Sequence, residues 1–242
     1  MRKSVIISIV IPFLCIIRLL AQEKLDSSLV NELERMIIID QLAATNSRPE
    51  GHSSALSMSE WKDSIYRAHQ SRLEKILNKH SYPGYDLVGK RGSQLFWTMV
   101  QHSDFEPDFQ KRVLDSMRIE VINKNANAHN YAFLTDRVKK NFNEKLFYGT
   151  QVTYHWFTGK AQPLPTIDPE NLNKRRAEIG LEPIEDYLKE MTQLNNSQGN
   201  SVTGGITNLA LLLIVAVLTV SALVVVFLLK KKKAIDNRVD GR

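Results

Sequence analysis

Apolar residues recur three or four positions apart through most of the central chain, the spacing that places them on one face of a helix. This spacing holds in turn over residues 22–44, 57–79, 93–102, 106–123 and 128–141. The segments between them contain Pro, Gly, Ser or Asn, which favour turns and helix ends. We therefore predict five amphipathic helices in this part of the chain.

The pattern changes near residues 147–165. Tyr148, Tyr154 and Trp156 fall at alternating positions in a stretch rich in aromatic and β-branched residues. Such alternation is typical of a strand. We predict a small β or irregular element here, with one or two short strands followed by an extended loop. The predicted fold class is therefore mainly α.

Two more helices and a linker complete the central region. A helix is predicted over 168–179, because an Asp-Pro pair begins it and Gly180 follows as an end signal. A last helix is predicted over 183–191. Residues 192–205 are rich in Asn, Gln, Ser and Gly, a composition typical of a flexible stalk.

A long apolar run lies toward the C-terminus. Residues 209–229 hold 16 Leu, Ile, Val or Phe among 21 positions and no charge. As a helix at about 1.5 Å per residue, the run is about 31 Å long, which matches the hydrocarbon core of a bilayer. Four lysines follow at residues 230–233, and a lysine at the bilayer centre costs about 2.5–3.5 kcal/mol. We predict one transmembrane helix within 206–229.

The N-terminus has the features of a secretory signal. A positive start is followed by an apolar run to Ile17, and Ala21 offers a small residue before a possible cleavage point. Arg18 interrupts this segment, so an uncleaved anchor stays open as the alternative. Because positive flanks favour the cytoplasm, both versions place the central region on the opposite side of the membrane.

The predicted protein is thus a single-pass protein of the cell membrane with most of its chain extracytoplasmic. Its parts are a signal peptide or N-terminal anchor (1–21), a mainly helical domain (22–191), a stalk (192–205), a transmembrane helix (206–229) and a short basic cytoplasmic tail (230–242).

The net charge of +6 belongs to the two ends of the chain. The N-terminal segment carries +3 and the tail +4, which leaves about −1 for the region between them. A near-neutral domain offers no broad basic face, so we predict no nucleic-acid partner. The only cysteine is Cys15, and the central domain therefore has no disulfide, thiolate nucleophile or cysteine-ligated metal.

The central sequence has no HExxH, no GxSxG, no phosphate-binding glycine loop and no zinc pattern. Four polar clusters are left as candidates. They are Gln101-His102-Ser103-Asp104, Leu134-Thr135-Asp136-Arg137, Tyr148-Gly149-Thr150-Gln151 and Asn173-Lys174-Arg175-Arg176.

The first two clusters offer acid–base chemistry. His102 and Asp104 can share a proton or a metal ion where the backbone turns, although an Asp in this position more commonly caps the next helix. Asp136 and Arg137 are adjacent on a predicted helix and do not face each other, so each needs a partner elsewhere. A structural ion pair is the commoner outcome for such a pair.

The other two clusters, together with Gln101, offer ligand recognition. Tyr148, Thr150 and Gln151 supply hydroxyl and amide groups in an aromatic setting, which suits a ligand site and equally suits a strand packed on helices. The basic run 173–176 suits an anionic ligand or lipid headgroup, whereas such runs usually form a solvated face. His69, on an apolar helix stripe, is interpreted as a core or boundary residue.

Taken in order, the clusters resemble an uncharacterised bacterial family, a domain of unknown function. The shared succession is QHxD, LxDR, YGTQ and DP…RR…GLxP, over about residues 82–191, with the N-terminal helices and the membrane anchor outside it. The resemblance implies a shared mainly α fold and brings no activity or cofactor. It directs attention to Gln101, His102, Asp104, Asp136, Arg137, Tyr148 and Gln151.

Two functions stay open. The first is a membrane-anchored module that binds a ligand or protein partner of the cell envelope. It is favoured by the single span, the stalk and the lack of a recognisable active site. The second is an extracytoplasmic hydrolase, in which His102 is the general acid or base, oriented by Asp104 or Asp136, and Arg137 stabilises negative charge.

In the hydrolase, Tyr148 and Gln151 would position the substrate. A metal-dependent version would add His129 or His155 to His102 and Asp104 as ligands. The sequence predicts no cofactor and leaves open whether the protein is an enzyme.

Overall fold

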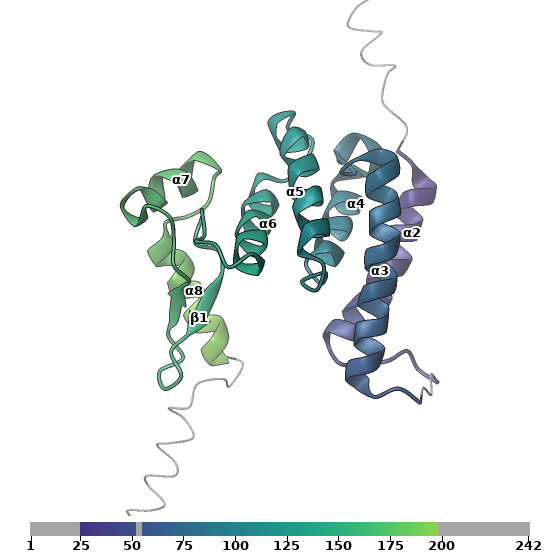
Figure 1. The fold of residues 1–242 in the computed structure, drawn as a ribbon, viewed down its shortest axis with the longest axis horizontal. Helices are drawn as coiled ribbons and strands as arrows, with labels where there is room; N and C mark the ends of the chain where they lie inside the picture. Colours follow the sequence, from purple (N-terminus) through teal and green to yellow (C-terminus); the bar gives the residue numbers. More distant parts are fainter. Residues whose placement is uncertain (1–24, 52–54, 198–242) are drawn as a thin grey trace, which may run out of the picture. The chain divides into compact units, whose positions relative to one another are not determined.

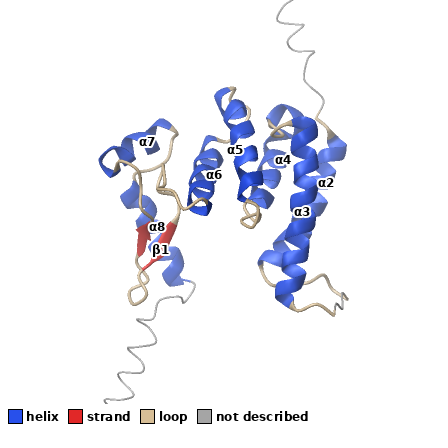
Figure 2. Cartoon of the chain, in the orientation of Figure 1, coloured by secondary structure: helices blue, strands red, loops and turns tan. Residues whose placement is uncertain are grey.

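The computed structural model describes residues 25–51 and 55–197 of the 242-residue chain. Figure 1 shows the helices and strands of these residues, which divide into two compact units. Among the described residues, unit 1 comprises those up to residue 151 together with 165–182, whereas unit 2 comprises 152–164 and 183–197. Helices dominate the described residues, with one short pair of strands (Figure 2). The predicted mainly α fold with a small β element is confirmed.

Unit 1 is a set of packed helices. Its elements are α2 (Ser27–Ala44), α3 (Met58–His80), α4 (Tyr85–Val100), α5 (Pro107–Ile122), α6 (Ala128–Asn141), the 3-10 turn η1 (Pro169–Asn171) and α7 (Leu172–Glu178). α2 packs against both α3 and α4, and α5 packs against α6.

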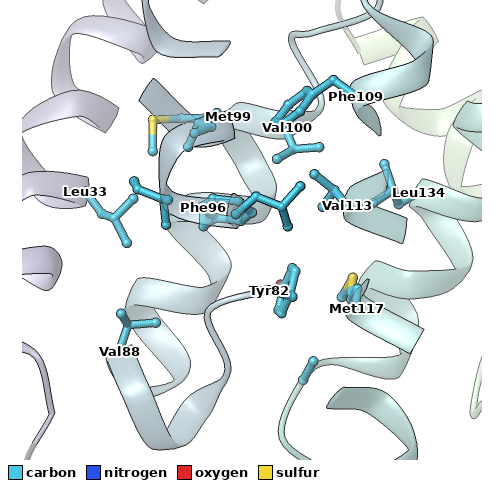
Figure 3. Close-up of a cluster of buried hydrophobic side chains, with 14 of the residues drawn as sticks. Leu33, Tyr82, Val88, Phe96, Met99, Val100, Phe109, Val113, Met117 and Leu134 are labelled. Atoms are coloured by element: carbon cyan, nitrogen blue, oxygen red, sulfur yellow. The ribbon is translucent and has the colours of Figure 1, made fainter. Parts of the chain in front are cut away.

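The apolar stripes of α2 to α6 meet in one core. Figure 3 shows Leu33, Phe96, Val113 and Leu134 within it, and none of the four has measurable exposure. Burying a side chain of this size stabilises a fold by about 1.5–3 kcal/mol. The core holds together the helices that carry the polar clusters.

Local signals explain where several helices begin. The side chains of Asp26 and Asn127 accept hydrogen bonds from first-turn amides of α2 and α6. Ser57 and Glu60 form a reciprocal capping box at the start of α3, and Pro107 occupies the first turn of α5. These contacts satisfy amides that have no partner within a helix.

α4 begins at Tyr85, earlier than the start predicted at residue 93. Gly89 interrupts its periodicity with φ +68° and ψ 171°, a conformation essentially restricted to glycine, so the helix is kinked there. Close to this break, the carbonyl of Leu87 accepts a hydrogen bond from the amide of Asp26. Because the kink interrupts the helical spacing of apolar residues, the spacing did not predict the first turns of α4.

Unit 2 is a β-hairpin packed on one helix. β1 (Val152–Tyr154) and β2 (Ala161–Pro163) are antiparallel, with Thr153 opposite Gln162, and α8 (Ile184–Ser197) packs on β2. The strand expected to start near 147 begins at 152, and the second strand occupies part of the expected loop. α8 continues to Ser197, through the first part of the segment for which a stalk is predicted.

No helix within 25–51 and 55–197 is long and apolar enough to cross a membrane. The predicted signal segment (1–21), the rest of the stalk (198–205), the transmembrane helix (206–229) and the tail (230–242) lie outside the residues that the structure describes.

Candidate functional site

His102 lies beside Asp40, a residue that the sequence argument did not single out. Asp40 is fully buried near the end of α2, and its Oδ2 is 2.8 Å from Nδ1 of His102, just after α4. The two groups are thus in close polar contact, although the contact does not meet the geometric criteria of a hydrogen bond. The side chain of His102 is 23% exposed, which leaves part of the ring accessible to solvent.

A second histidine and a tyrosine complete this cluster. Nδ1 of His69, on α3, is 3.4 Å from Oδ1 of Asp40, and the His69 side chain is 13% exposed. The ring of Tyr66 stacks on that of His102 with centroids 4.6 Å apart. His69 is therefore a boundary residue as predicted from its helical position, and it shares its acid with His102.

The two imidazoles determine the state of Asp40. Burial alone would raise the pKa of Asp40, but the contacts with His102 and His69 outweigh it, and the pKa lies below its ordinary value. Asp40 is therefore a carboxylate at neutral pH. A buried carboxylate that contacts a partly exposed imidazole can hold the ring in one orientation.

Asp104 and Arg137 belong to a separate network. Nε and one terminal nitrogen of Arg137 donate to the two oxygens of Asp104 at 2.8 and 2.9 Å, a bidentate pair. Asn141 and Gln110 also donate to Asp104, at 2.8 and 3.1 Å. Gln101 accepts from Arg137 at 3.3 Å. The network joins the end of α4 to α5 and α6.

The charge of Asp104 is well stabilised in this network. Partial burial by itself would raise the pKa of Asp104, but the hydrogen bonds from Arg137, Asn141 and Gln110 outweigh it and lower the pKa to about 2. A carboxyl with this pKa is a poor proton donor or acceptor near neutral pH. Its role is to hold α6 against the α4–α5 turn.

Asp136 organises the loop that follows α6. It is fully buried, and its oxygens accept hydrogen bonds from the amides of Phe147, Tyr148 and Thr150 at 2.7, 3.0 and 2.7 Å. The hydroxyl of Thr150 donates a further bond at 3.0 Å. These hydrogen bonds all come from residues 147–150, so Asp136 holds this segment against α6 before β1 begins.

Two arginines of the basic cluster hold the same loop from its other side. Arg176 is 1% exposed and donates to the carbonyls of Tyr148 and Glu182 at 2.7 and 2.6 Å. Arg175 donates to the carbonyl of Phe147 at 2.9 Å and lies over its ring. Lys174 alone of the three basic residues is exposed, so the expectation of a solvated basic face holds for one residue only.

The structure thus distributes the predicted site residues among three places in unit 1. His102 lies with Asp40, Asp104 lies with Arg137 and Gln101, and Asp136 lies with the backbone of the loop that contains Tyr148 and Thr150. Neither Asp104 nor Asp136 orients His102. The hydrolase arrangement predicted from the sequence is corrected in this respect, because both acids have other partners.

The metal-dependent version also lacks support in the described part of the chain. Among these residues, no group of three or more His, Cys, Asp or Glu side chains is placed to hold a metal ion. His129 lies at the start of α6, beside Gly180. His155 belongs to unit 2, where its Nδ1 accepts from the amides of Phe157 and Thr158.

Asp40 was missed because nothing adjacent in sequence marks it. It follows the apolar run Met36–Ile39 on an amphipathic helix, where a single acid is unremarkable. Its position on the helix could nevertheless have indicated that it is buried and has a partner. Asp40 lies seven residues after Leu33, on the buried stripe that also holds Ala43, and a charged residue on such a stripe is rarely buried without a partner.

A shallow groove lies between α5 and α6, on the surface of unit 1. Its volume is about 210 Å³ and it is lined mainly by apolar area, with Leu114, Val138 and Phe142 among the lining residues. Two ion pairs, Lys111–Asp115 and Lys139–Glu144, lie at its margin. The charges around the groove therefore largely neutralise one another.

Comparison with known proteins places the chain in a family without assigning an activity. No curated protein and no solved structure matches it. One family model matches residues 30–200. The match begins in α2 and includes Asp40, so it is longer than the resemblance inferred over 82–191 and takes in the N-terminal helices. The chain belongs to the family of unknown function DUF6624.

Proposed function

We propose that the chain is a membrane-tethered interaction module of the cell envelope, with its helical domain on the extracytoplasmic side. The observation that carries the proposal is that the side chains of the motif residues bind other parts of the same chain. Asp104, Asp136 and Arg176 each make several internal contacts, and the last two are buried. Groups held in this way stabilise a fold and are not free to act on a substrate.

The groove between α5 and α6 is the binding surface that fits this proposal. It exposes Phe142, with 39% of its surface accessible, and Ile119 and Ile122 on α5 are also exposed, at 60% and 70%. Because the marginal charges are paired within the chain, an apolar segment of an envelope protein suits the groove better than a charged ligand.

Photo-crosslinking of the full chain in its native membrane tests the proposal. A photoreactive residue in place of Phe142 is expected to give a discrete protein adduct, whereas the same residue in place of exposed Lys174 gives none. The adduct should persist in a His102→Asn background, because His102 is not part of the groove. Absence of an adduct from the groove, together with a turnover that His102→Asn abolishes, would overturn the proposal.

A hydrolase is the second candidate, and the His102–Asp40 contact is the observation that favours it. In this version Asp40 takes the orienting role that was predicted for Asp104 or Asp136, and the accessible part of the His102 ring acts as general acid or base. The variants His102→Asn and Asp40→Asn should lower kcat and leave KM largely unchanged.

The control for this candidate is His129→Asn, because His129 lies at the start of α6, outside the Asp40 cluster, and its replacement should leave kcat unchanged. Asp136→Ala is unsuitable as a test of catalysis, because loss of the buried carboxylate would unfold the loop it holds. Equal turnover in the original chain and in His102→Asn, measured on ester, amide and phosphoester substrates, would exclude His102 as the general acid or base.

A further inference from the structure

We propose that the tip of the β1–β2 hairpin lies in the headgroup region of the bilayer to which the chain is tethered. Unit 2 would then contact the lipid surface directly instead of standing away from it on a stalk. This inference rests on the membrane tether of the proposed function and adds to it a second contact, made by side chains of the folded domain.

The large apolar side chains that unit 2 exposes are gathered at one end. Within the described residues of this unit they are Tyr154 at 40% exposure, Trp156 at 74% and Leu194 at 46%. The first two lie at the hairpin tip and the third in the last turns of α8. Tryptophan and tyrosine are the residues enriched where a membrane meets water, since their rings combine an apolar body with a polar group.

Hydrogen bonds hold the hairpin tip beside the C-terminal end of α8. Asn195 is buried and donates from Nδ2 to the carbonyl of Gly159 at 3.0 Å. The amide of Ala161 donates to the hydroxyl of Thr192 at 2.9 Å. In Figure 1 the turn of the hairpin and the last turn of α8 lie at the same end of this unit. The exposed aromatic residues therefore lie where the chain leaves the domain toward the apolar run.

The tip has a defined backbone. The amide of His155 donates to the carbonyl of Lys160 at 2.9 Å, and the amide of Gly159 donates back to the carbonyl of His155 at 2.8 Å. Gly159 has φ +67°, which closes the turn without strain at a glycine. Trp156 stacks on the ring of His155 and stays exposed. The turn thus presents the indole outward instead of folding it against α8.

The charged side chains of α8 all lie in its first half, where Lys189 accompanies the acids. The acidic side chains Glu185, Asp186 and Glu190 lie in its first half, and the last two turns carry none. The hairpin contributes Lys160 and no acid. α8 is about 21 Å long at about 1.5 Å per residue, so Glu185 and Asp186, in its first turn, lie farthest along the helix from Asn195, which bonds to the hairpin turn. An anionic lipid surface attracts lysine and repels carboxylates.

The length of the following chain keeps this end close to the membrane. Eleven residues, 198–208, separate the end of α8 from the apolar run at Leu209. Even a fully extended chain spans at most about 3.6 Å per residue, or about 40 Å in all. If residues 209–229 cross the bilayer, the aromatic tip is therefore confined to a layer next to the lipid surface.

Lipid quenching of a dye on the hairpin tests the inference. The full chain, with Cys15→Ser and Thr158→Cys, is labelled at position 158 and reconstituted in phosphatidylcholine–phosphatidylglycerol vesicles that contain headgroup-region nitroxide lipids. The dye is expected to be quenched by the lipids and protected from aqueous iodide. The matched control carries Asp186→Cys in place of Thr158→Cys and should show the reverse.

Adding Trp156→Glu to the Thr158→Cys chain should reduce lipid quenching several-fold, whereas Trp156→Tyr should retain it. The unlabelled chain offers a second measurement. The emission of Trp156 is obtained by subtracting the spectrum of the Trp156→Phe variant. This emission should also be quenched by the nitroxide lipids. Iodide access to position 158 without lipid quenching would overturn the inference, and so would equal quenching at 158 and 186.

Flotation of the same vesicles separates this inference from the tether itself. A chain that floats but whose tip stays in water contradicts the hairpin contact alone. A chain that does not float contradicts the tether and, with it, the hairpin contact. In native membranes, a photoreactive residue at position 156 should crosslink to lipid, and an adduct with protein only would assign the tip to a protein partner instead.

Discussion

Asp136 is a carboxylate whose hydrogen bonds all serve the backbone of a neighbouring loop. It accepts from three amides and one hydroxyl in a site without solvent exposure. Asp104 and Arg176 have similar internal roles, one in a bidentate ion pair and the other on two carbonyl groups. At the scale of single residues, these contacts predict effects on stability rather than on turnover.

Replacing Asp136 by Asn should destabilise unit 1 by about 3 kcal/mol, because the amide nitrogen turns toward amide donors and leaves them buried without acceptors. Asp115→Asn is the control, since Asp115 forms an exposed pair with Lys111 one turn away on the same helix and should leave the unfolding midpoint unchanged. Urea unfolding of a fragment spanning residues 22–205 measures both. If Asp136→Asn left the free energy of unfolding nearly unchanged, the hydrogen bonds to the loop would contribute little to stability.

The lowered pKa of Asp104 predicts that the stability of the fold depends on pH. Its folded pKa of about 2 lies below the ordinary 3.8, so its contribution is fully present above pH 3.8 and is lost as pH falls through about 2. The shift corresponds to at most about 2.5 kcal/mol, and solvent screening of this half-exposed group lowers the expectation to about 1 kcal/mol.

The measurement is the difference in unfolding free energy between the original chain and Asp104→Asn. It should be about 1 kcal/mol and constant from pH 6 to about pH 5, and should shrink below about pH 4 as Asp104 is protonated. A difference that stays constant down to about pH 2, or that grows as pH falls, would contradict the assigned pKa.

At the scale of elements, α4 depends on a conformation that only glycine adopts easily. Gly89 kinks the helix, and an added Cβ would lie 3.3 Å from Cδ1 of Leu25. The direction of the second half of α4 decides where Gln101 and His102 emerge, so the kink contributes to both polar networks.

Gly89→Ala should lower the unfolding free energy by about 1–3 kcal/mol, because its φ and ψ lie in a region almost restricted to glycine. The control is Gly51→Ala, which also has a positive φ, of +74°, but has no atom within 4 Å of the added Cβ and lies in a loop. Chemical unfolding should show the larger loss for Gly89→Ala. Equal losses would indicate that the kink is not needed for the core.

Periodicity predicted most elements because their apolar stripes are continuous and their ends are marked. α6 is an example, with its predicted bounds reproduced and Asn127 as its cap. The kinked start of α4 and the position of β2 were not predictable in this way, because one depends on a glycine conformation and the other on pairing with β1 and packing on α8.

The site was predictable only in part. The motif residues do make contacts within the fold. Their spacing along the chain does not reveal which residues of other helices they contact. His102 and Asp40 are 62 positions apart, and Arg176 reaches a carbonyl 28 positions away. Such pairs are set by tertiary packing.

At the scale of the whole molecule, the proposed function depends on the side of the membrane on which the helical domain lies. The proposed tether puts unit 1 and unit 2 outside the cytoplasm and the basic tail inside. The interaction module, its groove and the lipid contact of the hairpin all require this sidedness, since the proposed partner belongs to the cell envelope.

The most direct test is cysteine labelling of the full chain in intact spheroplasts. Cys15 is the only cysteine, so Cys15→Ser gives a background into which Lys174→Cys or Arg238→Cys is placed. A membrane-impermeant maleimide should label position 174 in intact spheroplasts and position 238 only after permeabilisation. Labelling of 238 in intact spheroplasts, or protection of 174 until permeabilisation, would contradict the proposed topology.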